Sequence, residues 1–138
     1  MTMIQGIDHV AIAVADLETA IQLFESVLGM KVKHREDVAS FKVKIATLAT
    51  GGTDIELIQA TSEDSPVAKF VAERGPGLHH VGFAVPDIEK ALGALREQGV
   101  QLIDPMPRPG KEGSRVAFIH PKATNRVLCE LVQPIQKS

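Results

Sequence analysis

The chain has 138 residues, of which 44% are hydrophobic and 23% are charged, and its formal net charge is −2. This length and composition are typical of one soluble globular domain over 1–138, because two separate halves of about 65 residues would each bury a marginal core. No stretch approaches the ~18 apolar residues that a transmembrane helix needs, so we expect no membrane partner. The weak charge and the absence of Trp and Tyr also argue against nucleic acid, which is bound by basic faces and stacking aromatic rings.

The cysteine content and the N-terminal sequence predict the compartment. Cys129 is the only cysteine, which excludes an intramolecular disulfide, and the first residues lack the charged and apolar regions of a secretory signal. We therefore expect a cytoplasmic protein. Strand alternation turns Cys129 away from the side of its neighbour Glu130, so we expect a buried, inert thiol.

The first predicted strand, "GIDHVAIAV" at 6–14, is nearly repeated by "GLHHVGFAV" at 77–85. Because side chains alternate between the two faces of a strand, His9 shares one face with alanines and leaves the bulky residues on the other. His80 has the same position in the second copy. We expect the bulky face of each strand to pack under a helix and the face with the histidine to border a site.

A helix is predicted after each of these strands. It begins at an N-cap aspartate, Asp16 or Asp87, and ends at a glycine, Gly29 or Gly99, with apolar residues at helical spacing between them. The further strands are predicted near 31–37, 41–49 and 54–60 in the first half and near 100–103, 115–120 and 127–133 in the second half.

Between the halves, a short connecting helix is predicted within 62–77. Ser62 is its expected N-cap, Pro66 lies in its first turn and Gly75 ends it. The order of elements is then βαβββ in residues 1–61 and again in residues 78–138. Helices and mixed strands in this order predict an α+β fold made of two tandem modules.

The last strands of the halves also match, since "DIELIQ" and "LCELVQ" place Glu56 and Glu130 at equivalent positions. His80 follows His9 by 71 positions and Glu130 follows Glu56 by 74, so both pairs belong to one duplication. A solvated sheet face accounts for either glutamate alone, and a hydrogen bond to the backbone accounts for either histidine alone. An isolated carboxylate within an apolar strand face, however, costs several kcal/mol unless it is paired or coordinated.

Taken together, the four residues favour a catalytic metal site. Imidazole nitrogen and carboxylate oxygen are ligands for a borderline to hard divalent ion, and four of them leave two positions of an octahedral ion for substrate or water. The other histidines have less specific interpretations. We expect surface or loop positions for His34 and His79, and a position at the border of a pocket for His120.

On these residues the chain resembles the vicinal oxygen chelate superfamily, which includes glyoxalase I, extradiol dioxygenases, antibiotic-resistance proteins and methylmalonyl-CoA epimerase. The resemblance spans essentially the whole chain. It implies two tandem βαβββ modules that form a cup-shaped, curved mixed sheet with helices on the outside. It also implies that His9, Glu56, His80 and Glu130 are the metal ligands.

More specifically, "EDSPVAKFVAERGPGLHHV", "LIDPMPRPGKEGSRVAFIHPK" and "VLCELV" resemble methylmalonyl-CoA epimerases in order and spacing. This resemblance implies interconversion of (R)- and (S)-methylmalonyl-CoA by 1,1-proton transfer through a metal-stabilised enolate. The implied ion is Co²⁺, with Mn²⁺, Ni²⁺ or Zn²⁺ as alternatives, and the implied assembly is a homodimer. Some epimerases carry a base on the third strand where this chain has Ile45, so the candidate proton-transfer residues are Glu130 and Glu56.

Other functions stay open at this point. Glyoxalase I, the lactoylglutathione lyase, uses a similar ligand set. A metal-free binding protein of the same fold would usually have lost the ligands, which this chain keeps. An extradiol dioxygenase ordinarily has two histidines and one carboxylate, so the second glutamate argues against it. The basic stretch "RPGKEGSR" at 108–115 fits either the phosphates of a CoA ester or a solvated hairpin.

Overall fold

A computed structural model describes residues 3–135, so the ends of the expected modules at 1–2 and 136–138 lie outside the described residues. The chain forms two compact units. One is His9–His79, and the other combines Met1–Asp8 with His80–Ser138. Within residues 3–135, no helix is long and apolar enough to cross a membrane.

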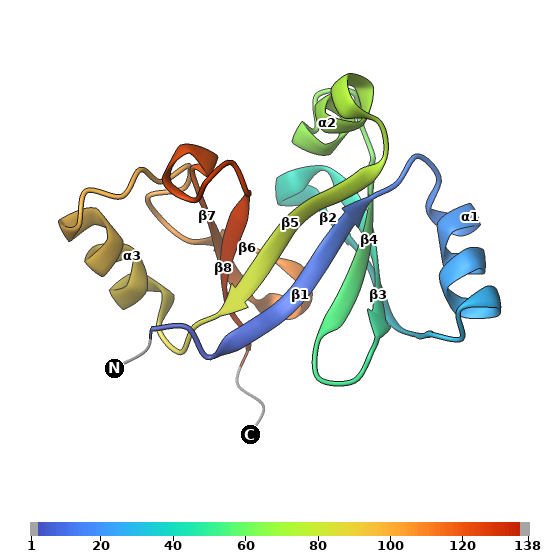
Figure 1. The fold of residues 1–138 in the computed structure, drawn as a ribbon, viewed down its shortest axis with the longest axis horizontal. Helices are drawn as coiled ribbons and strands as arrows, with labels where there is room; N and C mark the ends of the chain where they lie inside the picture. The colour runs from blue at the N-terminus through green and yellow to red at the C-terminus, as the bar shows by residue number, and fades with distance from the viewer. Residues whose placement is uncertain (1–2, 136–138) are drawn as a thin grey trace. The chain divides into compact units, whose positions relative to one another are not determined.

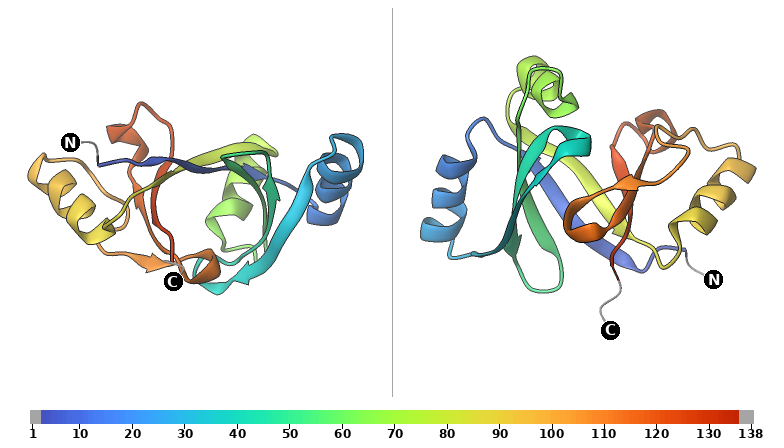
Figure 2. Two further views of the ribbon diagram at one scale, coloured as in Figure 1. Left: turned by 90° about the horizontal axis from the view of Figure 1, so that it is seen from below. Right: turned by 180° about the vertical axis from the view of Figure 1, so that it is seen from behind.

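The unit His9–His79 is a mixed sheet with a helix on each face. Its strand order is β2-β3-β4-β1, in which β1 and β4 are parallel and the other neighbours are antiparallel. Figures 1 and 2 show α1 and α2 on opposite sides of these strands. The elements are β1 (Gly6–Ala13), α1 (Leu17–Ile21), the π-helical continuation η1 (Gln22–Val27), β2 (Lys31–Val38), the 3-10 turn η2 (Ala39–Phe41), β3 (Val43–Ala49), β4 (Asp54–Ala60) and α2 (Pro66–Arg74).

Two apolar clusters hold this unit together, one on each face of the sheet. Helix α1 packs its buried residues Leu17 and Ile21 onto one face, where Ile12 of β1 also lies. This arrangement confirms that the bulky face of the first strand packs under a helix. On the other face, Ala11 and Ala13 pack with apolar residues of β2, β3, β4 and α2.

The starts of α1 and α2 follow from their capping residues. The Asp16 side chain accepts hydrogen bonds from the backbone N–H and the hydroxyl of Thr19, and these bonds hold the pKa of Asp16 below its ordinary value. The prediction of Ser62 as the cap of α2 was wrong, because Ser65 accepts the hydrogen bond from the N–H of Val67. Pro66 occupies the first helical position, which leaves the residue directly before it as the cap.

The second unit repeats the arrangement with α3 on one face of its strands (Figure 1). Its strand order is β5-β8-β7-β6, with β5 and β8 parallel. Asp87 caps α3 by accepting from the N–H of Lys90, as predicted. The elements are β5 (Gly77–Ala84), α3 (Ile88–Glu97), β6 (Arg108–Pro109), η3 (Lys111–Gly113), β7 (Arg115–Ile119), η4 (Pro121–Ala123) and β8 (Cys129–Gln133).

The strand expected near 100–103 does not form, and a two-residue strand, β6, stands in its place. Leu102 makes only an isolated bridge to Ile119. Three of the five residues at 105–109 are prolines, which lack the N–H that a ladder requires. The buried side chain of Asp104 compensates, since it accepts a hydrogen bond of 2.9 Å from the N–H of Phe118. With β6 counted, both modules read βαβββ, which confirms the predicted α+β class.

Candidate active site

The first candidate pair consists of His9 on β1 and Glu56 on β4. Parallel pairing of these strands places Glu56 opposite Ala11, the residue that shares the face of His9. The Nδ1 atom of His9 lies 3.2 Å from Oε2 of Glu56, and the two side chains are only 3% and 4% exposed. The sequence prediction that this histidine and this glutamate meet is therefore correct within the unit.

The second pair consists of His80 on β5 and Glu130 on β8. Glu130 lies opposite Gly82 in the parallel register, two positions after His80 on the same face. The Nε2 atom of His80 lies 3.4 Å from Oε1 of Glu130, and both side chains are buried. The ring of Phe118 packs edge-on against His80 at 5.1 Å and so restricts the orientation of the imidazole.

The two pairs fit the chemistry of metal ligands. An octahedral ion with bonds of about 2.1 Å separates neighbouring ligand atoms by about 3.0 Å, which is close to the 3.2 and 3.4 Å of the two pairs. Each unit therefore contributes a nitrogen and an oxygen donor, buried and adjacent to each other. A buried carboxylate beside an imidazole can also accept and return a proton.

His34 lies within the strand predicted near 31–37 and is partly exposed, in agreement with the expected surface or loop position. It belongs to strand β2, and its Nε2 atom lies 2.8 Å from Oε1 of Glu36. Regular alternation would put His34 on the same face as Val32, but a register shift between these residues turns them to opposite faces. A bulge of this kind leaves no clear signal in the sequence, which is why this pair was missed.

Ser114 is a second residue that the sequence interpretation did not single out. It immediately precedes β7, in which Phe118 lies opposite Glu130, so alternation places the Ser114 side chain on the face of Glu130. Its side chain is buried, and its Oγ has no hydrogen-bond partner among the described residues. Such a hydroxyl is suited to a ligand oxygen.

The other residues that the sequence analysis considered make packing contacts or local hydrogen bonds. The His79 ring packs at 4.8 Å against Phe70 of α2, and Nδ1 of His120 accepts a hydrogen bond from the N–H of Lys122. Cys129 is buried in the apolar cluster under α3, as expected. Ile45 lies in an apolar cluster with Ala11 and Ala13.

The basic stretch 108–115 places each of its cations near a carboxylate of its own unit. Arg108 lies 3.4 Å from Asp104, Arg115 lies 3.3 Å from Glu89, and Lys111 lies 3.9 Å from the neighbouring Glu112. These contacts pair the cations with carboxylates of the same unit, including Glu89 of α3. They favour the structural interpretation of this stretch over a phosphate site.

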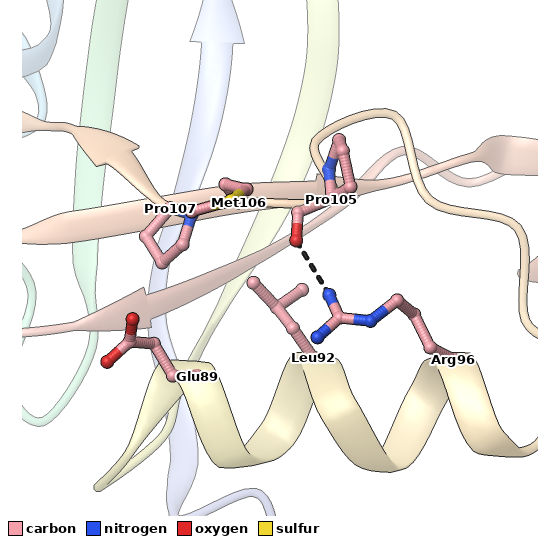
Figure 3. A pocket seen from close by; sticks show the side chains of 6 residues that line it. All are labelled: Glu89, Leu92, Arg96, Pro105, Met106 and Pro107. Carbon is pink, nitrogen blue, oxygen red and sulfur yellow. Dashed lines mark hydrogen bonds between the residues drawn. The ribbon is translucent and has the colours of Figure 1, made fainter.

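A cavity of about 280 Å³ lies between α3 and the proline-rich segment before β6 (Figure 3). Arg96 crosses it and donates a hydrogen bond of 2.7 Å to the carbonyl oxygen of Pro105. None of the four candidate ligands lines this cavity. It therefore belongs to the packing of the helix against the loop and not to the candidate site.

Comparison with known proteins identifies the family. The Glyoxalase/Bleomycin resistance protein/Dioxygenase superfamily matches residues 8–118. The chain is 43% identical to an uncharacterized protein, YqjC, of Bacillus subtilis over 93% of this chain and 91% of that protein. It is 38% identical to an ethylmalonyl-CoA/methylmalonyl-CoA epimerase of Cereibacter sphaeroides over 95% of this chain and 99% of the epimerase.

A solved structure and a more distant relative refine the comparison. The crystal structure of methylmalonyl-CoA epimerase from Mycobacterium tuberculosis matches with a TM-score of 0.95 and 39% identity, over 99% of this chain and 92% of that one. A protein named "Probable lactoylglutathione lyase, chloroplastic" of Arabidopsis thaliana is 30% identical over 80% of this chain but only 31% of its own length. The chain therefore belongs to the Glyoxalase/Bleomycin resistance protein/Dioxygenase superfamily, and within it to the group of the methylmalonyl-CoA epimerases.

Proposed function

We propose that this protein is a metal-dependent methylmalonyl-CoA epimerase, which interconverts the (R)- and (S)-epimers of its substrate. One observation carries the proposal. A buried histidine–glutamate pair occurs at the equivalent place in each half of a chain that is similar to epimerases over nearly its whole length. The reacting carbon lies between a thioester and a carboxylate, so the enzyme must stabilise an enolate and move a proton.

We propose that His9, Glu56, His80 and Glu130 together hold one divalent ion. The donor atoms, their burial and their separation within each pair support this assignment. When bound, such an ion supplies a Lewis acid that stabilises negative charge on the substrate's thioester oxygen. Co²⁺ is the first choice, with Mn²⁺, Ni²⁺ or Zn²⁺ as alternatives, because imidazole and carboxylate ligands suit all four. Elemental analysis of the purified protein and titration of the apo-protein with each ion distinguish them.

Glu130 is the proposed first proton-transfer group. Its carboxylate takes the proton from the α-carbon, and the electron pair of the C–H bond moves into the thioester carbonyl. Inversion then requires a second group that returns a proton to the opposite face of the carbon. The sequence offers Glu56 as the candidate for this second group.

Other residues of the second unit fit the chemistry of the substrate. The buried hydroxyl of Ser114, on the face of Glu130, would donate a hydrogen bond to a carboxylate or thioester oxygen of a CoA ester. The small residues beside His80, Gly82 and Ala84, would leave volume for the branched acyl group. We further expect a homodimer, which light scattering coupled to size-exclusion chromatography measures directly.

Isotope exchange tests the proposed reaction. The metal-loaded protein is incubated in D₂O with one epimer of methylmalonyl-CoA, while deuterium at C2 and the appearance of the other epimer are followed. The proposal requires both signals. If neither is seen while the same preparation forms S-lactoylglutathione from the glutathione hemithioacetal of methylglyoxal, the protein is a lactoylglutathione lyase instead.

A further inference from the structure

Strand β2 carries a further imidazole–carboxylate pair, His34 and Glu36, on the face of the sheet that holds His9 and Glu56. In the antiparallel register His34 lies opposite Thr47, and Thr47 lies opposite Glu56, so these three residues form one row across three strands. Glu36 begins the next row, opposite Ile45. With strands about 4.8 Å apart, His34 lies about 10 Å from Glu56 between backbones, within reach of one substrate.

The face of this pair is fixed independently by packing. Val38, two positions after Glu36, is buried with Ala11 and Ala13, whereas Val32 packs in the cluster of α1 on the other face. The register shift at Lys33 between them therefore turns the strand over. Bulges re-aim side chains in this way and are frequent beside active sites.

The pair is neither part of the core nor fully solvated. The His34 and Glu36 side chains are 31% and 29% exposed, and Nε2 of His34 lies 2.8 Å from Oε1 of Glu36. An intermediate exposure lets a ligand reach the carboxylate while the imidazole holds it in one orientation. By contrast, Arg35 points to the other face and contacts Glu18 near the start of α1.

The carboxylates on this face differ in their partners. Asp54 lies 2.8 Å from the ammonium group of Lys33, and Glu56 contacts the proposed metal ligand His9. Glu36 also contacts an imidazole, but that of His34, which is not a proposed metal ligand and so remains available to exchange protons with the carboxylate. Of the three, Glu36 has the partner best suited to a group that must take up and return a proton.

We propose that Glu36 is the second proton-transfer group of the epimerase, a catalytic residue that His34 positions. This inference rests on the proposed function. In one direction the Glu36 carboxylate removes the α-proton, the C–H electron pair moves into the thioester carbonyl, and protonated Glu130 delivers a proton to the opposite face of the carbon. In the other direction the two residues exchange roles, so no net proton is gained or lost.

The variant Glu36→Gln separates this role from a structural one. A two-base enzyme that lacks one base still exchanges the α-proton of one epimer through the base that remains. We therefore expect epimerisation to fall at least 100-fold, while one epimer still takes up deuterium from D₂O and the other does not. The matched control is Asp37→Asn, a neighbouring exposed carboxylate on the same strand, which we expect to leave both signals unchanged.

Two further variants address positioning and folding. His34→Ala should lower kcat about tenfold with little change in KM, and His34→Gln, which keeps a donor near the position of Nε2, should recover most of the loss. Glu36→Ala should regain activity when formate is added, because a free carboxylate can occupy the vacated space. Thermal melting verifies that each variant is folded.

The outcomes are distinguishable. Epimerisation by folded Glu36→Gln within threefold of the unsubstituted protein would overturn the inference, and so would an equal loss of exchange from both epimers. In the first case, the same assay on Glu56→Gln tests the remaining candidate. Absence of exchange and of epimerisation in the unsubstituted, metal-loaded protein contradicts the proposed function itself.

Discussion

The side-chain oxygen of Gln59 accepts a hydrogen bond of 2.7 Å from the backbone N–H of Leu17, the first residue of helix α1. Gln133 does the same for Ile88, the first residue of α3, at 2.8 Å. Each glutamine follows the glutamate of its module by three positions. The last strand of each module therefore positions a proposed metal ligand on one face and anchors the start of a helix on the other.

The first prediction concerns these anchors. Gln59→Leu and Gln133→Leu should each lower the free energy of unfolding by about 1–2 kcal/mol, because each leaves a helical N–H without its acceptor. Gln59→Glu and Gln133→Glu are the controls, since they keep an acceptor oxygen and add favourable charge at a helix N-terminus. Urea denaturation measures all four variants. Equal loss in the Leu and Glu variants would mean that packing, not the hydrogen bond, fixes the helices.

The second prediction concerns the proposed metal site and uses two adjacent histidines. His80→Ala should weaken metal binding at least ~10-fold, because it removes the nitrogen donor beside Glu130. His79→Ala is the matched control, since its ring packs against Phe70 and strand alternation turns it away from that donor set. Titration calorimetry with Co²⁺ on the apo-proteins measures both affinities.

Thermal melting gives this prediction a second measurement. A ligand that binds only the folded state raises the melting temperature, so added metal should stabilise His79→Ala but stabilise His80→Ala much less. Equal stabilisation of both variants would remove His80 from the metal site, even if its loss also lowered activity.

The third prediction contrasts two glycines of the second unit. A Cβ at Gly110 would lie 2.6 Å from Oγ of Ser114 and 2.7 Å from Cγ1 of Val116, so Gly110→Ala should destabilise the fold by about 1–3 kcal/mol. A Cβ at Gly93, inside α3, would meet nothing within 4 Å, so Gly93→Ala should stabilise the fold by about 0.5–1 kcal/mol. Chemical denaturation measures both. If Gly110→Ala left the free energy of unfolding unchanged, the loop before β7 would be able to shift without loss of stability.

The sequence predicted the parts of the fold that depend on local and periodic signals. The repeated strands, the caps Asp16 and Asp87 and the α+β order of elements were all readable, because capping and alternation are chemistry between near neighbours. The contact between His9 and Glu56 could be predicted as well, because the duplication gives each of these residues an equivalent in the other half. These features required no knowledge of the tertiary structure.

What could not be predicted depends on irregularities in the strands. The bulge at Lys33 sets the face of His34 against regular alternation, and the prolines after Leu102 replace a regular strand by a bridge and a hydrogen bond to the side chain of Asp104. In both places a contact between distant segments overrides the local pattern. The hydroxyl of Ser114 was missed for a similar reason, since its burial arises from packing that no periodicity reports.

The fourth prediction follows from the contact between Asp64 and Lys42 at the surface of the first unit. Hydrogen bonds from Lys42 and Ser62 lower the pKa of the Asp64 carboxyl from 3.8 to about 2. A carboxyl whose pKa is lower in the folded state contributes stability above its unfolded pKa, and this contribution disappears as the pH falls through its folded pKa. Asp64→Asn should therefore melt slightly below the unsubstituted protein at pH 7, and the difference should shrink between about pH 4 and pH 2.

Melting curves over this range, with the neighbouring Glu63→Gln as control, measure the effect. A difference that stays constant down to pH 2 would assign it to packing, whereas its loss in 1 M salt at pH 7 would support the ionic origin.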